Sequence, residues 1–363
     1  MSDNLRENAV ILNLCKPDSC DSEAVSAAFG TPLNLPYILG QLLFHRIGGI
    51  AYHNLSQCGI LPKLNREFRN PLGMIYEAFA ERTKSFLRAE ALLAEVLSEA
   101  VFPLALLKGA YLARLYPIGT RTSNDFDVLI NPNDVQNISG LLLDRGFTQG
   151  FLRAGEFTPA TRAEIVYARM NKGETVPFVK QLNLPHMPYL EIDVNFSLGF
   201  GSGKDTDAVG AMLSRTESLI ETTHGNLPTL CRTDFLIHLC AHLYKEATTF
   251  HWVKAGRDLS LYKFCDILLF IDRFMDEDFA ERLIISAKEL GLQKECYYAF
   301  YYTRKLFDIQ NALFDVVIAA VRPESTGFMR QIIDPQGKRT LRHDLNFVDY
   351  LFHPNRLEIL TEV

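Results

Sequence analysis

Two acidic side chains stand two residues apart at the start of an apolar run, a spacing that could hold a metal ion. Asp125 and Asp127 lead into Val128–Ile130, and this pattern predicts a strand. Because side chains along a strand alternate between its two faces, both carboxylates should point to one face and Phe126 to the other. Two residues span ~6.6 Å along a strand, so both carboxylates can reach one Mg²⁺ or a close pair of ions.

A second segment, residues 189–196, repeats the alternation and places Glu191, Asp193 and Asn195 on one face. Two-metal phosphoryl and nucleotidyl transfer needs a further anionic oxygen ligand from elsewhere in the fold. If the two strands are neighbours, three or four carboxylates converge, and they would repel one another strongly without cations. The sequence therefore predicts a divalent-metal site and not a bare acidic patch.

These residues and their order resemble the nucleotidyltransferase superfamily typified by DNA polymerase beta, and within it a bacterial branch described as uncharacterised nucleotidyltransferase. That branch shows a strand ending in Leu-Lys-Gly, a helix, an Arg, three residues, Asp-x-Asp, and a later strand with a carboxylate before an aromatic residue. The matching positions are Lys108, Gly109, Arg121, Asp125, Asp127 and Asp193. The chain departs from the pattern at Asn195–Phe196, where the family more often has His-Trp, and at Ala110, where a Ser is common.

The resemblance implies a catalytic and metal-binding trio of Asp125, Asp127 and Asp193. Asp125 and Asp127 would hold two Mg²⁺ ions, and Asp193 would complete one site and help to deprotonate the attacking hydroxyl or amine. Metal ions that bridge triphosphate oxygens neutralise the charge that grows on the leaving pyrophosphate. The implied activity is transfer of a nucleoside monophosphate from an NTP to an acceptor. Glu191 is expected beside this trio, because Asp193 matches the family position better.

The resemblance also assigns the NTP contacts. Gly109 would let the backbone approach the phosphates at a helix start, where free N–H groups bind anions. Ala110 lacks the hydroxyl of the usual Ser, so phosphate binding must rely on the backbone, Lys108, Arg121 or Ser123. Lys263 falls in a helical segment that faces the nucleotide in the family, which makes it a candidate for a second triphosphate contact. It could instead form a salt bridge on the helix surface.

The expected fold class is α+β: a nucleotidyltransferase palm, with a mixed β-sheet and helices, flanked by N-terminal and C-terminal helical regions. The expected divisions are an N-terminal helical region at 1–82, the palm at 83–205, a helical domain at 206–320 and a docking tail at 321–363. Residues 198–205 are glycine-rich but lack the Gly and the Ser or Thr that a P-loop requires, so a flexible loop bordering the site is expected.

Other interpretations stay open. The Asp-x-Asp pair could guard the edge of a sheet, Lys108 could lie along the surface at a strand end, and Arg121 could pair with Asp125 for structure alone. The chain could also be a catalytically silent nucleotidyltransferase-like binding protein, such as an antitoxin or partner component. A Mg-dependent phosphohydrolase would use similar ligands but would not need the Lys-Gly helix start.

Composition limits the partners. The chain has 363 residues, 48% of them hydrophobic, and a net charge of −6, which disfavours the broad basic surface of nucleic-acid-binding proteins. We therefore expect an NTP and a small-molecule, peptide or protein acceptor, and no membrane. The start lacks a basic segment followed by an apolar core, and the seven scattered cysteines suit a reducing compartment, so cytoplasmic residence is expected.

Overall fold

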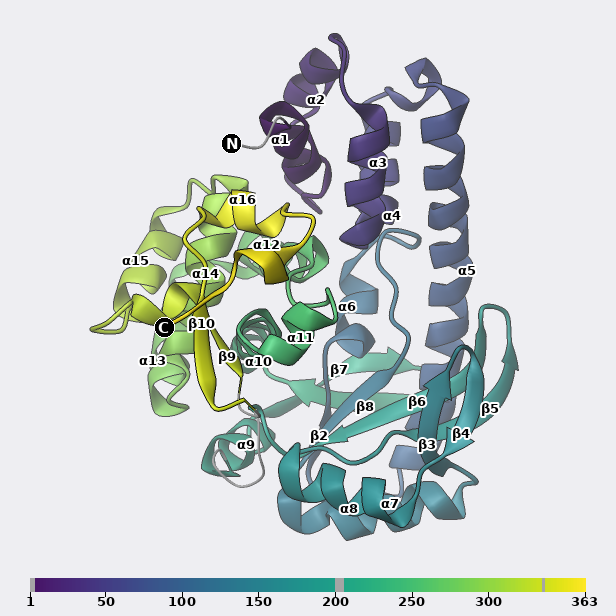
Figure 1. The fold of residues 1–363 in the computed structure, drawn as a ribbon. Coiled ribbons are helices and arrows are strands. Elements are labelled where there is room, and N and C mark those ends of the chain that lie inside the picture. The colour runs from purple at the N-terminus through teal and green to yellow at the C-terminus, as the bar shows by residue number, and fades with distance from the viewer. Residues whose placement is uncertain (1–3, 200–205, 335–336) are drawn as a thin grey trace. The chain divides into compact units, whose positions relative to one another are not determined.

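The computed structural model describes residues 4–199, 206–334 and 337–363, and the chain forms two compact units. The first unit combines the chain up to Tyr76 with Leu239–Val363, and the second is Glu77–His238. Two helices, α5 (Arg66–Leu97) and α10 (Arg232–Ala247), each continue from one unit into the other (Figure 1). The unit boundaries thus lie near the expected boundary at residue 82 and inside the expected helical segment 206–320.

The second unit contains an eight-stranded sheet with the order β4-β3-β5-β6-β2-β1-β8-β7. Its strands are β1 (Leu104–Leu106), β2 (Phe126–Ile130), β3 (Thr148–Arg153), β4 (Glu156–Pro159), β5 (Phe178–Leu184), β6 (Met187–Asn195), β7 (Thr216–Thr222) and β8 (Gly225–Leu230). The pairs β2–β6 and β1–β8 are parallel, and the other neighbouring pairs are antiparallel. The sheet is therefore mixed, and the expected α+β class is confirmed.

The middle of the sheet is buried, as the apolar runs predicted. All five residues of β2 are buried. Along β6, Ile192 and Val194 are buried, and the acidic residues that alternate with them, Glu191 and Asp193, are partly exposed. Phe126 turns away from the acidic face, and its ring stacks on Phe86 of α5 with the centroids 4.1 Å apart and the planes 9° apart. This stacking anchors the start of β2 against a long helix.

Helices of the second unit connect these strands. They are α6 (Gly109–Leu115), α7 (Val135–Asp144), α8 (Arg162–Asn171) and α9 (Thr206–Leu213), with a short 3₁₀ turn, η2 (Pro132–Asp134), before α7. In Figure 1, α7 and α8 lie on one side of the sheet. The sequence pattern of residues 150–190 fits either additional strands or an excursion over the site, and it leaves the choice undecided. In the structure this region holds the β3–β4 hairpin, α8 and β5, and a capping box between Thr161 and Glu164 starts α8.

The first unit is mainly helical, as expected for both ends of the chain. Its helices are α1 (Leu5–Leu14), α2 (Ser22–Phe29), α3 (Leu35–Phe44), α4 (Gly48–Gln57), α11 (Phe250–Lys254), α12 (Leu261–Phe274), α13 (Glu277–Glu289), α14 (Gln293–Phe307), α15 (Ala312–Ala320) and α16 (Phe347–Leu351). Short 3₁₀ turns lie at Leu61–Lys63, Gly327–Arg330 and Arg356–Ile359. The last turn is fixed by Arg356, whose buried guanidinium donates to both carboxylate oxygens of Asp258.

Several strands were not expected. Strands β7 and β8 form a hairpin in the segment 206–320 that we expected to be helical, and the C-terminal residues form a three-stranded sheet of β9 (Gln331–Asp334), β10 (Arg339–Arg342) and β11 (Thr361–Glu362). These strands are short, and partner strands decide their structure more than local propensity does. Of the glycine-rich segment 198–205, residues 200–205 lie outside the described residues.

No helix in the described ranges is long and apolar enough to cross a membrane. All seven cysteines are present as free thiols.

Candidate active site

A strained turn carries the lysine of the site. The backbone N–H of Leu107, just after β1, donates to the carbonyl oxygen of Asp127 at 2.9 Å. Lys108 follows with φ +41°, a conformation that non-glycine residues rarely adopt, and α6 begins at Gly109. Strain of this kind is retained mainly where it positions a functional group. In this turn it brings the Lys108 ammonium to 2.8 Å from Oδ1 of Asp127.

The carboxylates come from two adjacent parallel strands. In the β2–β6 pairing Asp127 lies opposite Asp193, so the two acidic segments are neighbours. This is the condition on which the expected convergence of carboxylates depends. Asp125 immediately precedes β2, and Glu191 lies two residues before Asp193 on the same face of β6. The sheet register, rather than a mobile loop, therefore holds Asp127 and Asp193 next to each other.

The carboxyl groups repel one another. Burial raises the pKa of Asp193 well above its usual range, and the charges of Asp125 and Asp127 raise it further. Burial and the charge of Asp127 likewise raise the pKa of Asp125, against the opposing effects of Lys108 and Ser123. Glu191 shows the same pattern, because burial and then Asp125 and Asp127 raise its pKa. The cluster thus carries more negative charge than its own surroundings neutralise.

Asp127 is the carboxylate of this cluster that forms an ion pair with Lys108. Burial disfavours the charged form of Lys108, but the attraction of Asp127, with Asp125 and Asp193, outweighs it and raises the lysine pKa. The Asn195 amide donates to the same oxygen of Asp127 at 3.4 Å, and to the carbonyl oxygen of Asp193 at 3.1 Å. Lys108 and Asn195 therefore occupy one Asp127 oxygen, whereas among the described residues no ammonium group forms an ion pair with Asp193.

The donor set suits a hard divalent cation such as Mg²⁺, which prefers carboxylate oxygens. The raised pKa values of Asp125 and Asp193 show that added positive charge would relieve repulsion in the cluster. Within the described ranges, no three His, Cys, Asp or Glu side chains already surround a single point closely enough to hold a metal ion. The residues fit the ion in charge and chemistry, and their side chains would have to draw together around it.

Ser123 lies directly against Gly109. A Cβ added at Gly109 would come within 2.3 Å of the Ser123 hydroxyl and 2.5 Å of its Cβ, so only glycine leaves room for this serine. The Arg82 side chain donates to the Ser123 carbonyl at 3.1 Å, which supports this position. Ser123 thereby brings a hydroxyl to the helix start at which Ala110 lacks one. The space above Gly109, expected for phosphate, is thus taken at least in part by Ser123.

Arg121 and Lys263, the two remaining phosphate contacts predicted from the sequence, belong to different units. Arg121 lies in the same segment as Ser123, its guanidinium donates to the Thr122 carbonyl, and its own carbonyl accepts from Thr83 of α5 at 3.2 Å. Lys263 is a buried residue of α12 in the first unit, where it forms an ion pair with Glu246. A contact between Lys263 and a triphosphate stays a prediction.

Sequence reasoning missed two charged residues of this site. Arg82 of α5 is partly buried, which lowers its pKa, and the charge of Asp125 acts on it in the opposite direction. Glu174 contributes to the raised pKa of Asp193, and its backbone forms an isolated bridge with Asn195. Arg82 lies on a helix with no motif around it, and Glu174 lies in the region 150–190 that the sequence left undecided. Neither carries a local signal.

Comparison with known proteins agrees with this geometry. A family model described as "Uncharacterised nucleotidyltransferase" matches residues 33–308, which is more than half of the chain. The match includes every site residue named above, from Arg82 to Lys263. No curated protein matched the chain.

Proposed function

Because the chain belongs to the uncharacterised nucleotidyltransferase family, we propose that it is a Mg²⁺-dependent enzyme that transfers a nucleoside monophosphate from an NTP to a hydroxyl or amine, with release of pyrophosphate. One observation carries the proposal: Asp127 and Asp193 lie opposite each other on adjacent parallel strands, and Asp125 is close enough to raise the pKa of Asp193. The acidic groups of two separate segments thus form one cluster beside the Lys108 turn.

Asp125, Asp127 and Asp193 are the proposed ligands of the metal, with room in the charge balance for two ions. When bound, Mg²⁺ neutralises phosphate charge and lowers the pKa of the attacking group. Asp193 is also the proposed group that helps to deprotonate the attacking hydroxyl or amine.

Lys108, Ser123, Arg121 and the backbone at Gly109 are the proposed phosphate contacts. The Lys108 ammonium already forms an ion pair with Asp127. Binding of a triphosphate with its cations would therefore have to break this pair, so that the lysine contacts phosphate and the carboxylate contacts the cation. Ser123 would offer its hydroxyl in place of the one that Ala110 lacks. We add Arg82 to this group, because it supports Ser123 and acts on Asp125.

The proposed acceptor is a small molecule, a peptide or a protein. A net charge of −6 gives little attraction for a polynucleotide, whose binding depends on neutralising many phosphates. An NTP is compatible with that charge, because its accompanying cations supply the local positive field.

A second candidate is a nucleotidyltransferase-like protein that binds a ligand without turnover. The observation in its favour is the Lys108–Asp127 ion pair, in which a lysine occupies an oxygen that a catalytic metal would use. Ala110 and Asn195, which depart from the family pattern, point the same way. The two candidates differ in what happens to the α-phosphate.

The test uses the full chain with each of four NTPs labelled at the α-phosphorus, Mg²⁺, and a cell extract as the source of acceptor. Label on an acceptor supports the proposal, and its loss in Asp127→Asn assigns it to this site. Binding of NTP with no labelled product favours the silent protein, and release of inorganic phosphate alone favours a phosphohydrolase. The matched control is Asp278→Asn, an exposed aspartate of α13 whose side chain is 72% accessible.

A further inference from the structure

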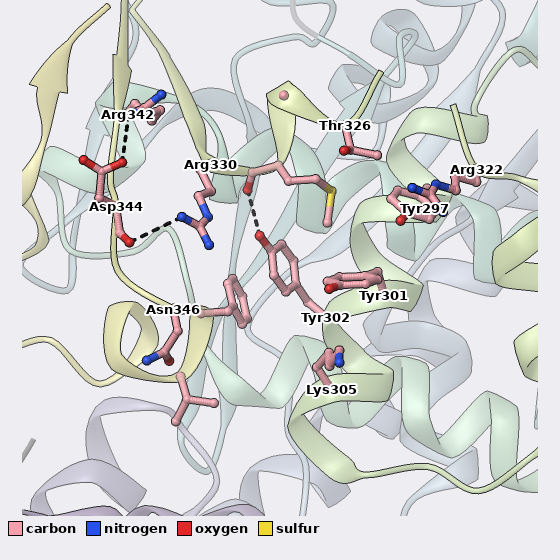
Figure 2. Close-up of a pocket in the computed structure, with 14 residues that line it drawn as sticks. Tyr297, Tyr301, Tyr302, Lys305, Arg322, Thr326, Arg330, Arg342, Asp344 and Asn346 are labelled. Atoms are coloured by element: carbon pink, nitrogen blue, oxygen red, sulfur yellow. Dashed lines mark hydrogen bonds and ion pairs between the residues drawn. The ribbon is translucent and has the colours of Figure 1, made fainter. Parts of the chain in front are cut away.

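A cavity with a volume of about 860 Å³ lies within the first unit, and none of its lining residues belongs to the carboxylate site. Its walls come from α14, from the chain after α15, and from the segment that leads into α16 (Figure 2). The volume falls in the range of about 300–1,000 Å³ that is usual for small-molecule sites. Most of its lining follows residue 308, beyond the part that the family model matches.

One wall is aromatic and fixed in place. Tyr302 is 5% exposed, its hydroxyl donates to the Met329 carbonyl at 2.9 Å, and its ring stacks on Phe347 with the centroids 3.6 Å apart. The Tyr301 ring lies edge-on to Tyr302 at 5.5 Å and is itself partly exposed. A held pair of rings with a more open third ring beside it can stack a planar ligand with little loss of side-chain freedom.

The rest of the lining is strongly basic. Four exposed cations line the cavity, which are Lys305, Arg322, Arg330 and Arg342. Asp344 is the one carboxylate among the lining residues, and it pairs with Arg342 at 2.9 Å. Arg330 donates to the Asp344 backbone carbonyl at 3.3 Å, and Lys305 lies over the Tyr301 ring (Figure 2). Among the described residues, no carboxylate comes within 4.0 Å of the charged groups of Lys305, Arg322 or Arg330.

Like charges gathered around one space repel each other, and an anion in that space would relieve the repulsion. The excess positive charge of this lining contrasts with the net charge of −6 of the whole chain. Arginine presents a planar set of donors that matches phosphate oxygens, so Arg322 and Arg330 are suited to a phosphate group. Tyr301 lines the same cavity and is partly exposed, so its ring can contact a planar ligand.

We propose that this cavity binds a small phosphorylated molecule with a planar ring, of the chemistry of a nucleoside monophosphate. The phosphate contacts Arg322, Arg330 and Lys305, and the ring stacks on Tyr301. An uncharged aromatic molecule would leave the cations unsatisfied, and free phosphate would leave the rings unused. The proposal needs no metal and does not depend on the transfer reaction, because every residue that it uses lies in the first unit.

The test is calorimetric titration of the full chain in EDTA, which removes any metal-dependent binding at the carboxylates. The probes are AMP, adenosine, inorganic phosphate and phosphotyrosine. AMP should bind, and adenosine and phosphate should each bind at least about tenfold more weakly, since each lacks one of the two groups. Phosphotyrosine as strong as AMP would identify the source as any phosphorylated ring and would keep the proposal.

The double variant Arg322→Gln/Arg330→Gln should weaken AMP binding at least about tenfold. Lys288→Gln, which changes an exposed lysine of α13 outside the cavity, should bind as the unchanged chain does. Tyr301→Ala should weaken AMP binding but not phosphate binding. Circular dichroism melting checks that each variant is folded. No AMP binding, equal binding of adenosine, or unchanged binding by the double variant would overturn the proposal.

Discussion

The carboxylate site of the second unit and the aromatic cavity of the first unit have opposite charge and different construction. The carboxylates share the register of two central strands and repel one another. The cations of the cavity come instead from α14, the segment after α15, a 3₁₀ turn and the end of β10, and they surround a set of rings. We propose that cations complete the first arrangement and that an anion completes the second. In both regions, groups of like charge repel one another, and a bound ligand of opposite charge would relieve that repulsion.

The contrast within the carboxylate cluster is as informative. Asp127 is paired with Lys108, while Asp193 has its pKa raised by burial and by neighbouring carboxylates. Removing the charge of one residue should therefore have a different effect on stability from removing that of the other.

Asp127→Asn should give the largest effect of all. It should lower transfer by a factor on the order of 10³ or more, because a metal ligand that stabilises charge in the transition state is lost. It should also lower the free energy of unfolding by about 2 kcal/mol, because Lys108 is left without its partner. Kinetic assays and chemical unfolding measure the two quantities. A variant that keeps full activity would remove Asp127 from the site.

Gly109→Ala should come next, with a loss of about 1–3 kcal/mol in the free energy of unfolding, because its Cβ would overlap Ser123. Ser123→Ala should not relieve the overlap, since the Ser123 Cβ is also too close. Ser123→Gly in the same chain should restore much of the loss. Urea unfolding of the single and double variants tests this, and additive losses would contradict the packing explanation.

Asp193→Asn should have a smaller and opposite effect on stability, with a melting temperature a few degrees higher at pH 8 in EDTA. A carboxyl group with a raised pKa binds a proton more readily in the folded state. The free energy of unfolding of the unchanged chain should therefore rise as pH falls from above that pKa towards the ordinary value of 3.8. Melting curves at several pH values should show a weaker rise for Asp193→Asn. An equal rise would show that protonation of Asp193 is not its cause.

A last prediction separates the two regions. Mg²⁺ should raise the melting temperatures of the unchanged chain and of Arg322→Gln/Arg330→Gln. It should raise the melting temperature of Asp193→Asn by less. AMP in EDTA should stabilise the unchanged chain and Asp193→Asn, but not the double arginine variant. Each gain should be about 1–3 kcal/mol when the ligand is well above its dissociation constant. If both ligands lost their effect in the same variant, the regions would not be independent.

Sequence alone predicted the part of the site that strands carry. The alternation in residues 189–196 and the Asp-x-Asp spacing predict which side chains share a face. That β2 and β6 are neighbours was a condition of the metal-site prediction, and the structure meets it. The alternation also predicted that Phe126 points to the opposite face, where the structure shows its ring stacked on Phe86 of α5. Period-two patterns are informative because a shift of one residue would exchange the two faces.

The sequence could not predict contacts between residues that lie far apart along the chain. The contact of Ser123 with Gly109, the support from Arg82 and the pairing of Lys108 with Asp127 each join residues from different elements. The same holds for β7 and β8, whose structure comes from the sheet edge that they extend. The cavity beside α14 was missed entirely, because its residues follow no period or spacing.

The most direct test of the central claim is transfer of label from an α-labelled NTP, with Mg²⁺ and extract, by the unchanged chain and by Asp193→Asn. We predict labelled acceptor with the unchanged chain and a loss by a factor on the order of 10³ in the variant, although the variant is folded and no less stable. Equal labelling by both proteins would contradict the claim that the acidic residues of β2 and β6 act together.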